Sequence, residues 1–416
     1  MRRATVLLVA AVALATACGT GRIVRSGQVD TAALEKVQRG LELVRGLRFT
    51  SPVPARVLDD AEVAALIERE LAREFRPGEL DRLGTIYGRL GLLTAGTHLE
   101  VALRELYGDQ IAALYDPRTK TLALTAGGLR QNTFTMQVLA FFTGRDLLGE
   151  LLVAHELTHA LQDQHYGLPT TARPLVDAHG DRTIARRALL EGDASLASVA
   201  YLRGGPLDQA TVQRFSEQVA VVPEELRARH PDVPEVIRAS LAFQYNTGSV
   251  FAATAYLRGG WPAIDAAHRD PPTSSEQVLH PAKYFASRER PLEVALGGTE
   301  ELEKSGWTRV LEDTFGELDI RVLVAHGLDA LRAGDVAAGW GGDRCRVLMR
   351  DEAVVIAWLS AWDTEADATD FAAALPAAVP DARIERRGTR VLMVVAPDTR
   401  KLVERIWTRS RVSAGG

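Results

Sequence analysis

The feature of the sequence that most constrains the fold is a pair of histidines four residues apart, in the stretch His155-Glu156-Leu157-Thr158-His159. Residues four apart lie one above the other on the same face of an α-helix, so a helix brings both imidazoles to one metal ion. Glu156 then lies beside the metal, where its carboxylate can polarise a bound water. The motif therefore predicts a helix that carries a catalytic zinc site.

The residues around this motif favour a helix from Leu147 to Tyr166. Asp146 is the expected N-cap, the leucines of the stretch supply an apolar surface, and Gly167 and Pro169 are expected to end the helix. The alternative is that both histidines are core residues with satisfied hydrogen bonds and that Glu156 is incidental. The helical setting favours a zinc hydrolase.

A catalytic zinc needs a third protein ligand, and the sequence has two candidates. His165 lies ten residues after His155, which is the outer spacing of the metzincin motif H-E-x-x-H-x-x-G-x-x-H, but residue 162 is Gln where that motif has Gly. Without a glycine to break the helix, His165 would lie about 15 Å along its axis from His155. Glu191, on a second predicted helix from Thr183 to Leu202, is the favoured ligand. His165 is then expected to be supporting or structural.

These motifs carry a resemblance to known proteins. H-E-x-x-H followed by a helical Glu-Gly-x-Ala resembles the gluzincins, which are thermolysin-like zinc metallopeptidases. More narrowly, the chain resembles bacterial exported metallopeptidases that carry H-E-L-x-H-A-L-Q-D-Q and L-x-E-G-D-A. The stretches Tyr115–Lys120 and Pro271–Pro281 also match that group, so the resemblance covers roughly residues 50 to 290.

The resemblance implies roles for individual residues. It implies that the zinc ligands are His155, His159 and Glu191 and that the catalytic base is Glu156. Many gluzincins have an Asp four residues after the ligand Glu that orients a ligand histidine. Here that position is Ser195, and Asp193 is the candidate substitute. Tyr245 and His280 are candidates for stabilising the oxyanion, although a lone Tyr or His is often structural.

A β-hairpin is predicted before the metal helix. The stretches Ile111–Tyr115 and Thr121–Thr125 flank the turn sequence Asp-Pro-Arg-Thr-Lys. Such a hairpin can form the edge of an active-site sheet, to which a peptide substrate adds as a further strand. The alternative is a hairpin that only covers the core.

The first residues are typical of an export signal. Arg2 and Arg3 precede an apolar stretch from Thr5 to Leu14, and small residues follow, so residues 1–17 are expected to be a signal peptide. Cys18 stands where bacterial lipoproteins carry the lipidated cysteine, although Ala15 departs from their pattern. We expect an exported, lipid-anchored protein of the cell envelope. The alternative is cleavage without lipidation, which gives a soluble secreted protein.

Composition and pattern complete the expected architecture. The formal net charge is −5 and there is no basic tract, which excludes nucleic acid as a partner. The expected fold is α+β: a helical segment over 19–50, a zincin-like catalytic domain over 51–287 that is mainly helical with a small active-site sheet, and a small α+β module over 288–416. Within that module, Gly339–Arg344 is expected to be an ordered loop.

The function expected from the sequence is zinc-dependent hydrolysis of peptide bonds, with a peptide or protein as the partner. Two alternatives share many of the same features. One is a zinc hydrolase that acts on a non-peptide amide. The other is a non-catalytic zinc-containing envelope protein with a scaffold or binding role, although structural zinc does not require the carboxylate of Glu156.

Overall fold

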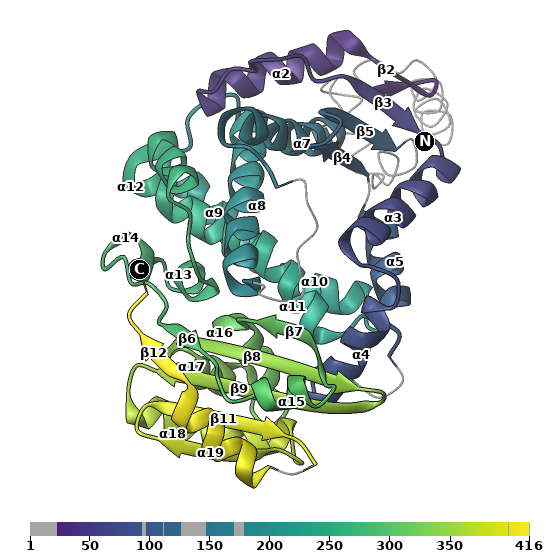
Figure 1. Cartoon of the computed structure of the whole chain (residues 1–416). Coiled ribbons are helices and arrows are strands. Elements are labelled where there is room, and N and C mark those ends of the chain that lie inside the picture. The colour runs from purple at the N-terminus through teal and green to yellow at the C-terminus, as the bar shows by residue number, and fades with distance from the viewer. Residues whose placement is uncertain are drawn as a thin grey trace, which may run out of the picture.

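The computed structural model describes residues 23–93, 97–110, 112–125, 147–169, 179–397 and 399–415. Helices and several small sheets share the fold, which confirms the α+β class (Figure 1). In this described part of the chain, no helix is long and apolar enough to span a bilayer. The predicted signal peptide, Cys18 and the N-cap Asp146 lie outside the described residues.

The N-terminal helix α2 (Thr31–Arg45) forms where the apolar spacing predicts it. The Asp30 side chain accepts a hydrogen bond from the Ala33 N–H at 3.0 Å and caps the helix, and Gly46 ends it with a φ of 76°. One face is buried against α7 (Leu147–Tyr166) and α8 (Gly180–Arg203). The short strands β1 (Val24–Arg25) and β2 (Gln28–Val29) precede it as an antiparallel pair.

The predicted hairpin belongs to a three-stranded sheet with the order β3-β5-β4. The central strand β5 (Thr121–Thr125) pairs in parallel with β3 (Ala55–Leu58) and antiparallel with β4 (Ala113–Asp116). Helices α3 (Asp60–Glu74), α4 (Glu79–Arg89) and α5 (Leu99–Gln110) connect β3 to β4. Strand β4 lies at one edge of this sheet and packs against α7.

Helix α8 lies against both α7 and α12 (Gly248–Arg269). A Cβ atom added to Gly192 of α8 would lie 2.0 Å from the Gly248 carbonyl oxygen. Only a glycine therefore permits this approach. Before α12 the chain passes through α9 (Gln209–Val219), α10 (Val222–Arg229), α11 (Glu235–Ala242) and a π-helical turn, η2 (Phe243–Thr247).

Two sequence-based expectations in this region can be compared with the structure. The glycine pair Gly259-Gly260 predicts the end of a helix, and both residues do have non-helical backbone angles; a second helical stretch follows directly, so α12 runs to Arg269 across this break. The spacing of Thr273 and Glu276 predicts a capping box for the short helix α13 (Ser275–Leu279), but the N-cap is Ser274, whose hydroxyl accepts from the Gln277 N–H at 3.2 Å. Thr273 instead donates its N–H to the Gln277 side chain, and α14 (Pro281–Phe285) follows directly.

The C-terminal part of the chain is built on a five-stranded antiparallel sheet with the order β10-β11-β9-β8-β7. Its strands are β7 (Thr308–Asp313), β8 (Trp340–Arg350), β9 (Ala353–Trp362), β10 (Arg383–Arg387) and β11 (Arg390–Val395). Its helices are α15 (Glu300–Lys304), α16 (Gly316–Val324), α17 (Ala330–Ala337), α18 (Glu365–Ala378) and α19 (Arg400–Arg409). Strands β6 (Glu293–Ala295) and β12 (Arg411–Ser413) pair beside it.

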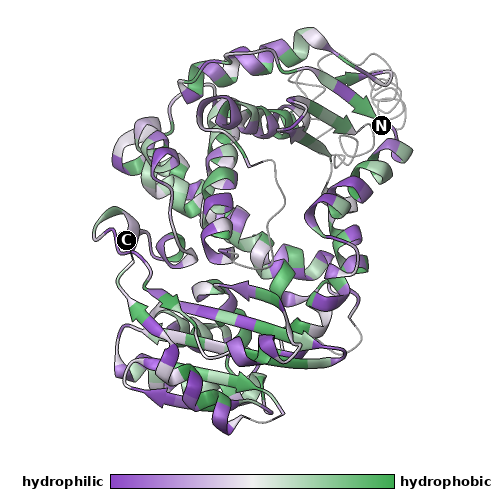
Figure 2. Ribbon diagram, viewed as in Figure 1, coloured by the Kyte–Doolittle hydropathy of each residue, from purple (hydrophilic) through white to green (hydrophobic). Residues whose placement is uncertain are grey.

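Side chains alternate between two covered faces of this sheet. On β9, Ile356 and Trp358 pack with α16, α17 and α18, whereas Val355 and Leu359 pack with α19. Hydrophobic residues are prominent along these strands in Figure 2. Because both faces are buried, the inner strands β9 and β11 are nearly continuous hydrophobic runs.

The expectation of a loop over Gly339–Arg344 is wrong, because β8 begins at Trp340. The polar Asp343 fits inside this buried strand because four donors bind its carboxylate. They are the indoles of Trp340 and Trp358 and the backbone N–H groups of Phe315 and Gly316, all between 2.9 and 3.1 Å.

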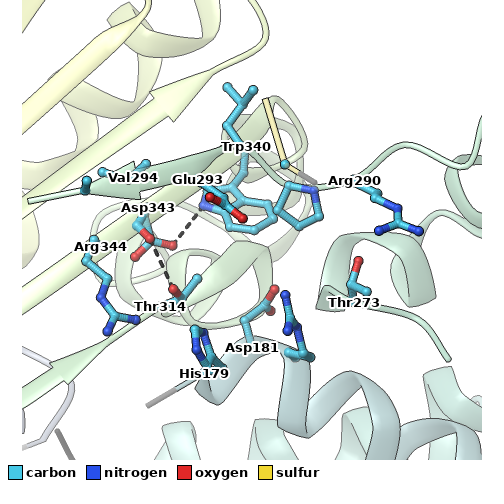
Figure 3. A pocket seen from close by; sticks show the side chains of 15 residues that line it. His179, Asp181, Thr273, Arg290, Glu293, Val294, Thr314, Trp340, Asp343 and Arg344 are labelled. Atoms are coloured by element: carbon cyan, nitrogen blue, oxygen red, sulfur yellow. Dashed lines mark hydrogen bonds between the residues drawn. The ribbon is translucent and has the colours of Figure 1, made fainter. Parts of the chain in front are cut away.

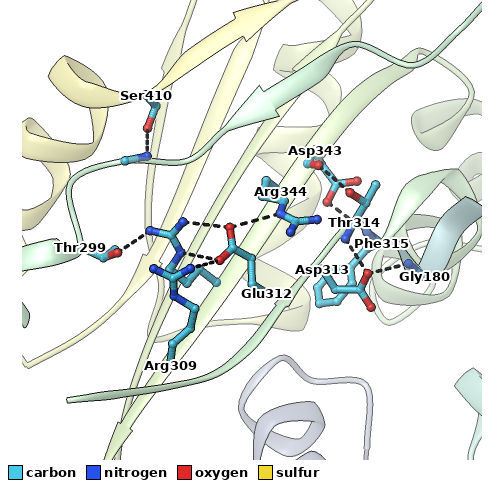
Figure 4. A network of polar contacts seen from close by, with 12 residues as sticks. Gly180, Thr299, Arg309, Glu312, Asp313, Thr314, Phe315, Asp343, Arg344 and Ser410 are labelled. Atoms are coloured by element: carbon cyan, nitrogen blue, oxygen red, sulfur yellow. Dashed lines mark hydrogen bonds and ion pairs between the residues drawn. The ribbon is translucent and has the colours of Figure 1, made fainter. Parts of the chain in front are cut away.

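A second polar network joins β7 to β8 around Glu312 (Figure 4). Glu312 accepts from Arg309, Arg344 and Arg346, with Arg346 Nη2 at 2.8 Å. Arg346 also donates to the Thr299 hydroxyl at 2.7 Å. The buried charges are therefore paired within the sheet.

The core of the C-terminal part includes a helix from the N-terminal half. Leu83, Ile86 and Leu90, at and just after α4, belong to the same apolar cluster as Trp340 and Ile356. Figure 1 shows α4 beside the larger sheet. The two parts thus share one hydrophobic core across the boundary expected near residue 288.

Candidate metal centre

Three predicted ligand side chains meet between α7 and α8. The Nε2 atoms of His155 and His159 lie 3.2 Å apart on α7. From α8, the Oε2 atom of Glu191 lies 3.0 Å from His155 Nε2 and 3.4 Å from His159 Nε2. The three donor atoms therefore form a nearly equilateral triangle.

This triangle fits a zinc ion. Tetrahedral zinc with nitrogen and oxygen ligands at about 2.0–2.2 Å places those donors about 3.3–3.6 Å apart. The observed separations differ from this range by a few tenths of an ångström at most. The three side chains keep 13% to 19% of their area exposed, so the site is shielded and yet open to a small molecule. Two imidazoles and one carboxylate are also a ligand set that zinc favours.

The charges of the cluster suit a cation. Burial disfavours a charged imidazole, but the Glu191 carboxylate raises the pKa of His159 to about 10. Burial also works against the charge on Glu191, but His159 and His155 hold the pKa of this carboxyl well below its usual range. An anion is thus built into the protein interior, and a metal ion would replace the proton that balances it.

Glu156 lies beside the triangle, with a carboxylate oxygen within 4.8 Å of a ring nitrogen of each histidine. Its Oε2 atom accepts a hydrogen bond from the Tyr115 N–H of β4 at 2.7 Å. Burial raises the pKa of Glu156. The backbone of the edge strand therefore orients the predicted base.

The hairpin is also held to α7 by side chains. The Tyr115 hydroxyl donates to Asp163 Oδ2 at 2.7 Å, and Lys120 Nζ lies 2.6 Å from the same oxygen. Asp163 is one helical turn beyond His159. The stretch Tyr115–Lys120 therefore positions β4 against the metal helix.

Tyr245 reaches the cluster from the π-helical turn η2. Its ring stacks on that of His155 with the centroids 6.1 Å apart, and its hydroxyl lies close enough to Glu191 to feel the charge of that carboxylate. Burial raises the pKa of the phenol well above its usual value, and the charges of Glu191 and Glu156 add to the effect. The close approach of Gly192 to Gly248 brings this turn to the site.

The remaining candidates lie at or beyond the margin of the cluster. His280 has a partner outside the ligand triangle, since its Nε2 atom lies 3.0 Å from Glu317 of α16, and its oxyanion role stays a prediction. Helix α7 continues through Gln162, and the exposed His165 contacts the Arg48 carbonyl at 2.9 Å. Asp193 is fully buried and reaches His159 only through Gln162.

Sequence reasoning missed Gln162, Arg45 and His268, which surround Asp193. One signal was present, because Gln162 follows His159 by three residues and such residues are neighbours on a helix. Arg45 and His268 come from distant helices, so spacing carried no signal for them.

A separate polar cavity of about 400 Å³ lies at the N-terminus of α8 (Figure 3). It is lined by parts of α8, of the Pro271–Pro281 stretch and of β8, among them Asp181, Thr273 and Asp343. Asp181 precedes Glu191 by ten residues, or about 15 Å along the helix axis. This cavity is therefore distinct from the histidine cluster.

Comparison with known proteins gives one match. A family model described as a domain of unknown function (DUF8575) matches residues 305–405. This range contains all five strands of the larger sheet and lies outside the histidine cluster. No curated protein and no solved structure matches the chain.

Proposed function

We propose that this protein is a zinc-dependent metallopeptidase of the gluzincin type, with a zincin-like catalytic region. The observation that carries the proposal is the triangle of His155, His159 and Glu191 donors at 3.0–3.4 Å with Glu156 beside it. Three protein ligands and an accessible fourth position are the arrangement of catalytic zinc.

Each side chain has a distinct part in the proposed reaction. His155, His159 and Glu191 would hold the zinc ion, which would supply a Lewis acid to activate a water and polarise a substrate carbonyl. Glu156 accepts the proton of the attacking water and passes it to the leaving amine. Because the Tyr115 N–H holds one carboxylate oxygen, the other oxygen is available for this transfer.

Tyr245 is proposed to stabilise the oxyanion that develops on the substrate. Its half-buried phenol has a raised pKa and therefore stays protonated, so it can donate a hydrogen bond. The Tyr245 ring stacks on that of His155, and its hydroxyl lies near Glu191. The hydrogen-bond donor is therefore beside the proposed ligands.

The edge strand favours a peptide as the substrate. In the register of β4 with β5, Ala113 and Tyr115 direct their backbone groups away from β5, as the bond from Tyr115 N–H to Glu156 shows. A peptide that adds to this edge would pass beside Glu156. We further propose that the protein is exported and anchored through a lipid on Cys18, on the basis of its leader sequence.

Hydrolysis of an unstructured protein substrate tests the proposal. Zinc-loaded protein should cleave it, and a chelator should abolish cleavage. Glu156→Gln should retain zinc and lose about 10²–10⁴-fold in rate, because the ligands remain and the proton acceptor is lost. Near-normal activity of zinc-loaded Glu156→Gln would contradict the mechanism. His165→Ala, on the same helix, is the matched control and should stay active.

A further inference from the structure

The buried amide of Gln162 connects the proposed metal site to the protein interior. Its Oε1 atom lies 2.8 Å from His159 Nδ1. Its Nε2 atom donates to the Leu190 carbonyl and to Asp193 Oδ2, each at 3.0 Å. The side chain is fully buried.

The hydrogen-bond partners define which way this amide points. The Leu190 carbonyl and the Asp193 carboxylate only accept hydrogen bonds, so the amide nitrogen must face them. The amide oxygen then faces His159, and His159 Nδ1 must be the donor. The lone pair of a neutral imidazole is thereby directed to Nε2, the atom in the ligand triangle.

The Asp193 carboxylate is in turn bound by two side chains from helices that are distant in the sequence. Arg45 of α2 binds both of its oxygens, with Nε at 2.9 Å and Nη2 at 3.2 Å, and His268 Nε2 of α12 lies 2.9 Å from Oδ2. Because a guanidinium binds both of its oxygens, the Asp193 carboxylate is held as an acceptor for Gln162.

Arg45 is itself fixed in place. Its side chain is fully buried, its Nη1 atom lies 2.8 Å from Asp265, and its guanidinium lies 4.8 Å from the Trp261 ring centroid. Residues of α2, α8 and α12 therefore form one connected network of polar contacts that ends at the Gln162 amide of α7.

We propose that Gln162 is a positioning residue for His159, anchored by the Asp193–Arg45 pair. It would fix the imidazole with Nδ1 protonated and Nε2 directed at the metal, while adding no charge to the site. This inference rests on the proposed zinc function. It adds Arg45 of the N-terminal helix α2 to the residues that support the metal site. Partners of this kind typically change metal affinity about 10–100-fold.

Three variants of the full chain test this role. Gln162→Leu removes both the acceptor for His159 and the donor for Asp193. Gln162→Glu keeps an acceptor for His159 but sets a second carboxyl group against Asp193, which should lower the thermal midpoint. Gln164→Leu is the matched control, because this amide on the same helix bonds to Thr50 and Ser51 instead.

Zinc affinity, measured by competition with a chromophoric chelator, is compared with the thermal midpoint of each variant. In the zinc-loaded protein, NMR follows solvent exchange of the His159 Nδ1 proton. We expect Gln162→Leu to lose about 10–100-fold in affinity and to expose this proton to exchange. Gln162→Glu should protect the proton and lose less affinity, and Gln164→Leu should match the wild type.

Two results would overturn the inference. Gln162→Leu with wild-type affinity and a protected proton would show that the amide does not position His159. Affinity that follows only the thermal midpoint in both Gln162 variants would show a purely structural role. If the wild-type protein itself fails to bind zinc, the proposed function fails and this inference fails with it.

Discussion

At the scale of single residues, three side chains from two helices define the proposed metal centre. The two histidines come from neighbouring turns of α7, and Glu191 comes from α8. The distances among their donor atoms already match those around zinc. Each ligand should therefore matter for metal binding, whereas neighbours that point away should not.

Replacing the third ligand tests this centre directly. Glu191→Ala should reduce zinc affinity by more than the roughly 10–100-fold that removal of a supporting residue costs, because two imidazoles alone leave the site underfilled. Zinc content after dialysis against metal-free buffer measures the effect. His165→Ala should keep its zinc, since that exposed side chain contacts the Arg48 carbonyl. Equal zinc loss in both variants would argue against Glu191 as a ligand.

At the scale of elements, the contact between α8 and the turn before α12 places Tyr245 at the site. Gly192 and Gly248 face each other so closely that a side chain on either would meet the backbone of the other helix. Gly192 follows the proposed ligand Glu191 directly. The glycine of the Glu-Gly-x-Ala stretch thus has a packing reason that is independent of metal chemistry.

Gly192→Ala should separate these two elements. A Cβ atom 2.0 Å from the Gly248 carbonyl forces a backbone shift, with an expected loss of about 1–3 kcal/mol in the free energy of unfolding. Activity should fall as well, because Tyr245 and Glu191 move apart. Gly84→Ala is the control: this helical glycine of α4 has no heavy atom within 4 Å of its added Cβ, so the change should be neutral or stabilising. Chemical denaturation of both variants provides the comparison.

At the scale of the whole molecule, the N-terminal half completes the core of the C-terminal sheet through α4. Five of the six tryptophans lie in the C-terminal part, and Trp261 is the other one. Tryptophan fluorescence therefore reports mainly on that part. It can show whether a substitution in α4 changes the stability of the C-terminal sheet.

Ile86→Ala tests the shared core. Ile86 is 1% exposed, so its truncation should lower the free energy of unfolding by about 2–5 kcal/mol. The fluorescence-detected transition should shift to lower denaturant even though residue 86 is far from the tryptophans in sequence. Leu43→Ala, at a leucine that is 81% exposed, should leave it unchanged. An unshifted tryptophan transition in Ile86→Ala would mean that the C-terminal part folds independently.

The proposed anchor also belongs to this scale. If Cys18 carries lipid, the mature protein should partition with membranes, and Cys18→Ser should release it or leave the leader uncleaved. Cell fractionation combined with mass spectrometry of the N-terminus measures both. A mature protein that begins at an unmodified Cys18 would refute lipidation.

Much of this protein follows from local pattern alone. The bounds of α7 match the predicted range Leu147–Tyr166, and the α+β class follows from the mixture of helical and strand patterns. The two histidines and Glu156 could be singled out because helix geometry fixes the relative positions of side chains one and four residues apart. Glu191 could be proposed because a second helix with small residues follows closely.

Only the tertiary structure decided which distant side chains meet. Arg45, Asp193 and His268 lie on three helices, and their ion pairs depend on how those helices pack. The same holds for α4 on the C-terminal sheet, and for Asp343 inside the buried strand β8, where three of the four donors to its carboxylate come from other parts of the chain. Periodicity reports the burial of one face of one element, whereas these contacts arise between elements. Their partners are therefore absent from any local pattern.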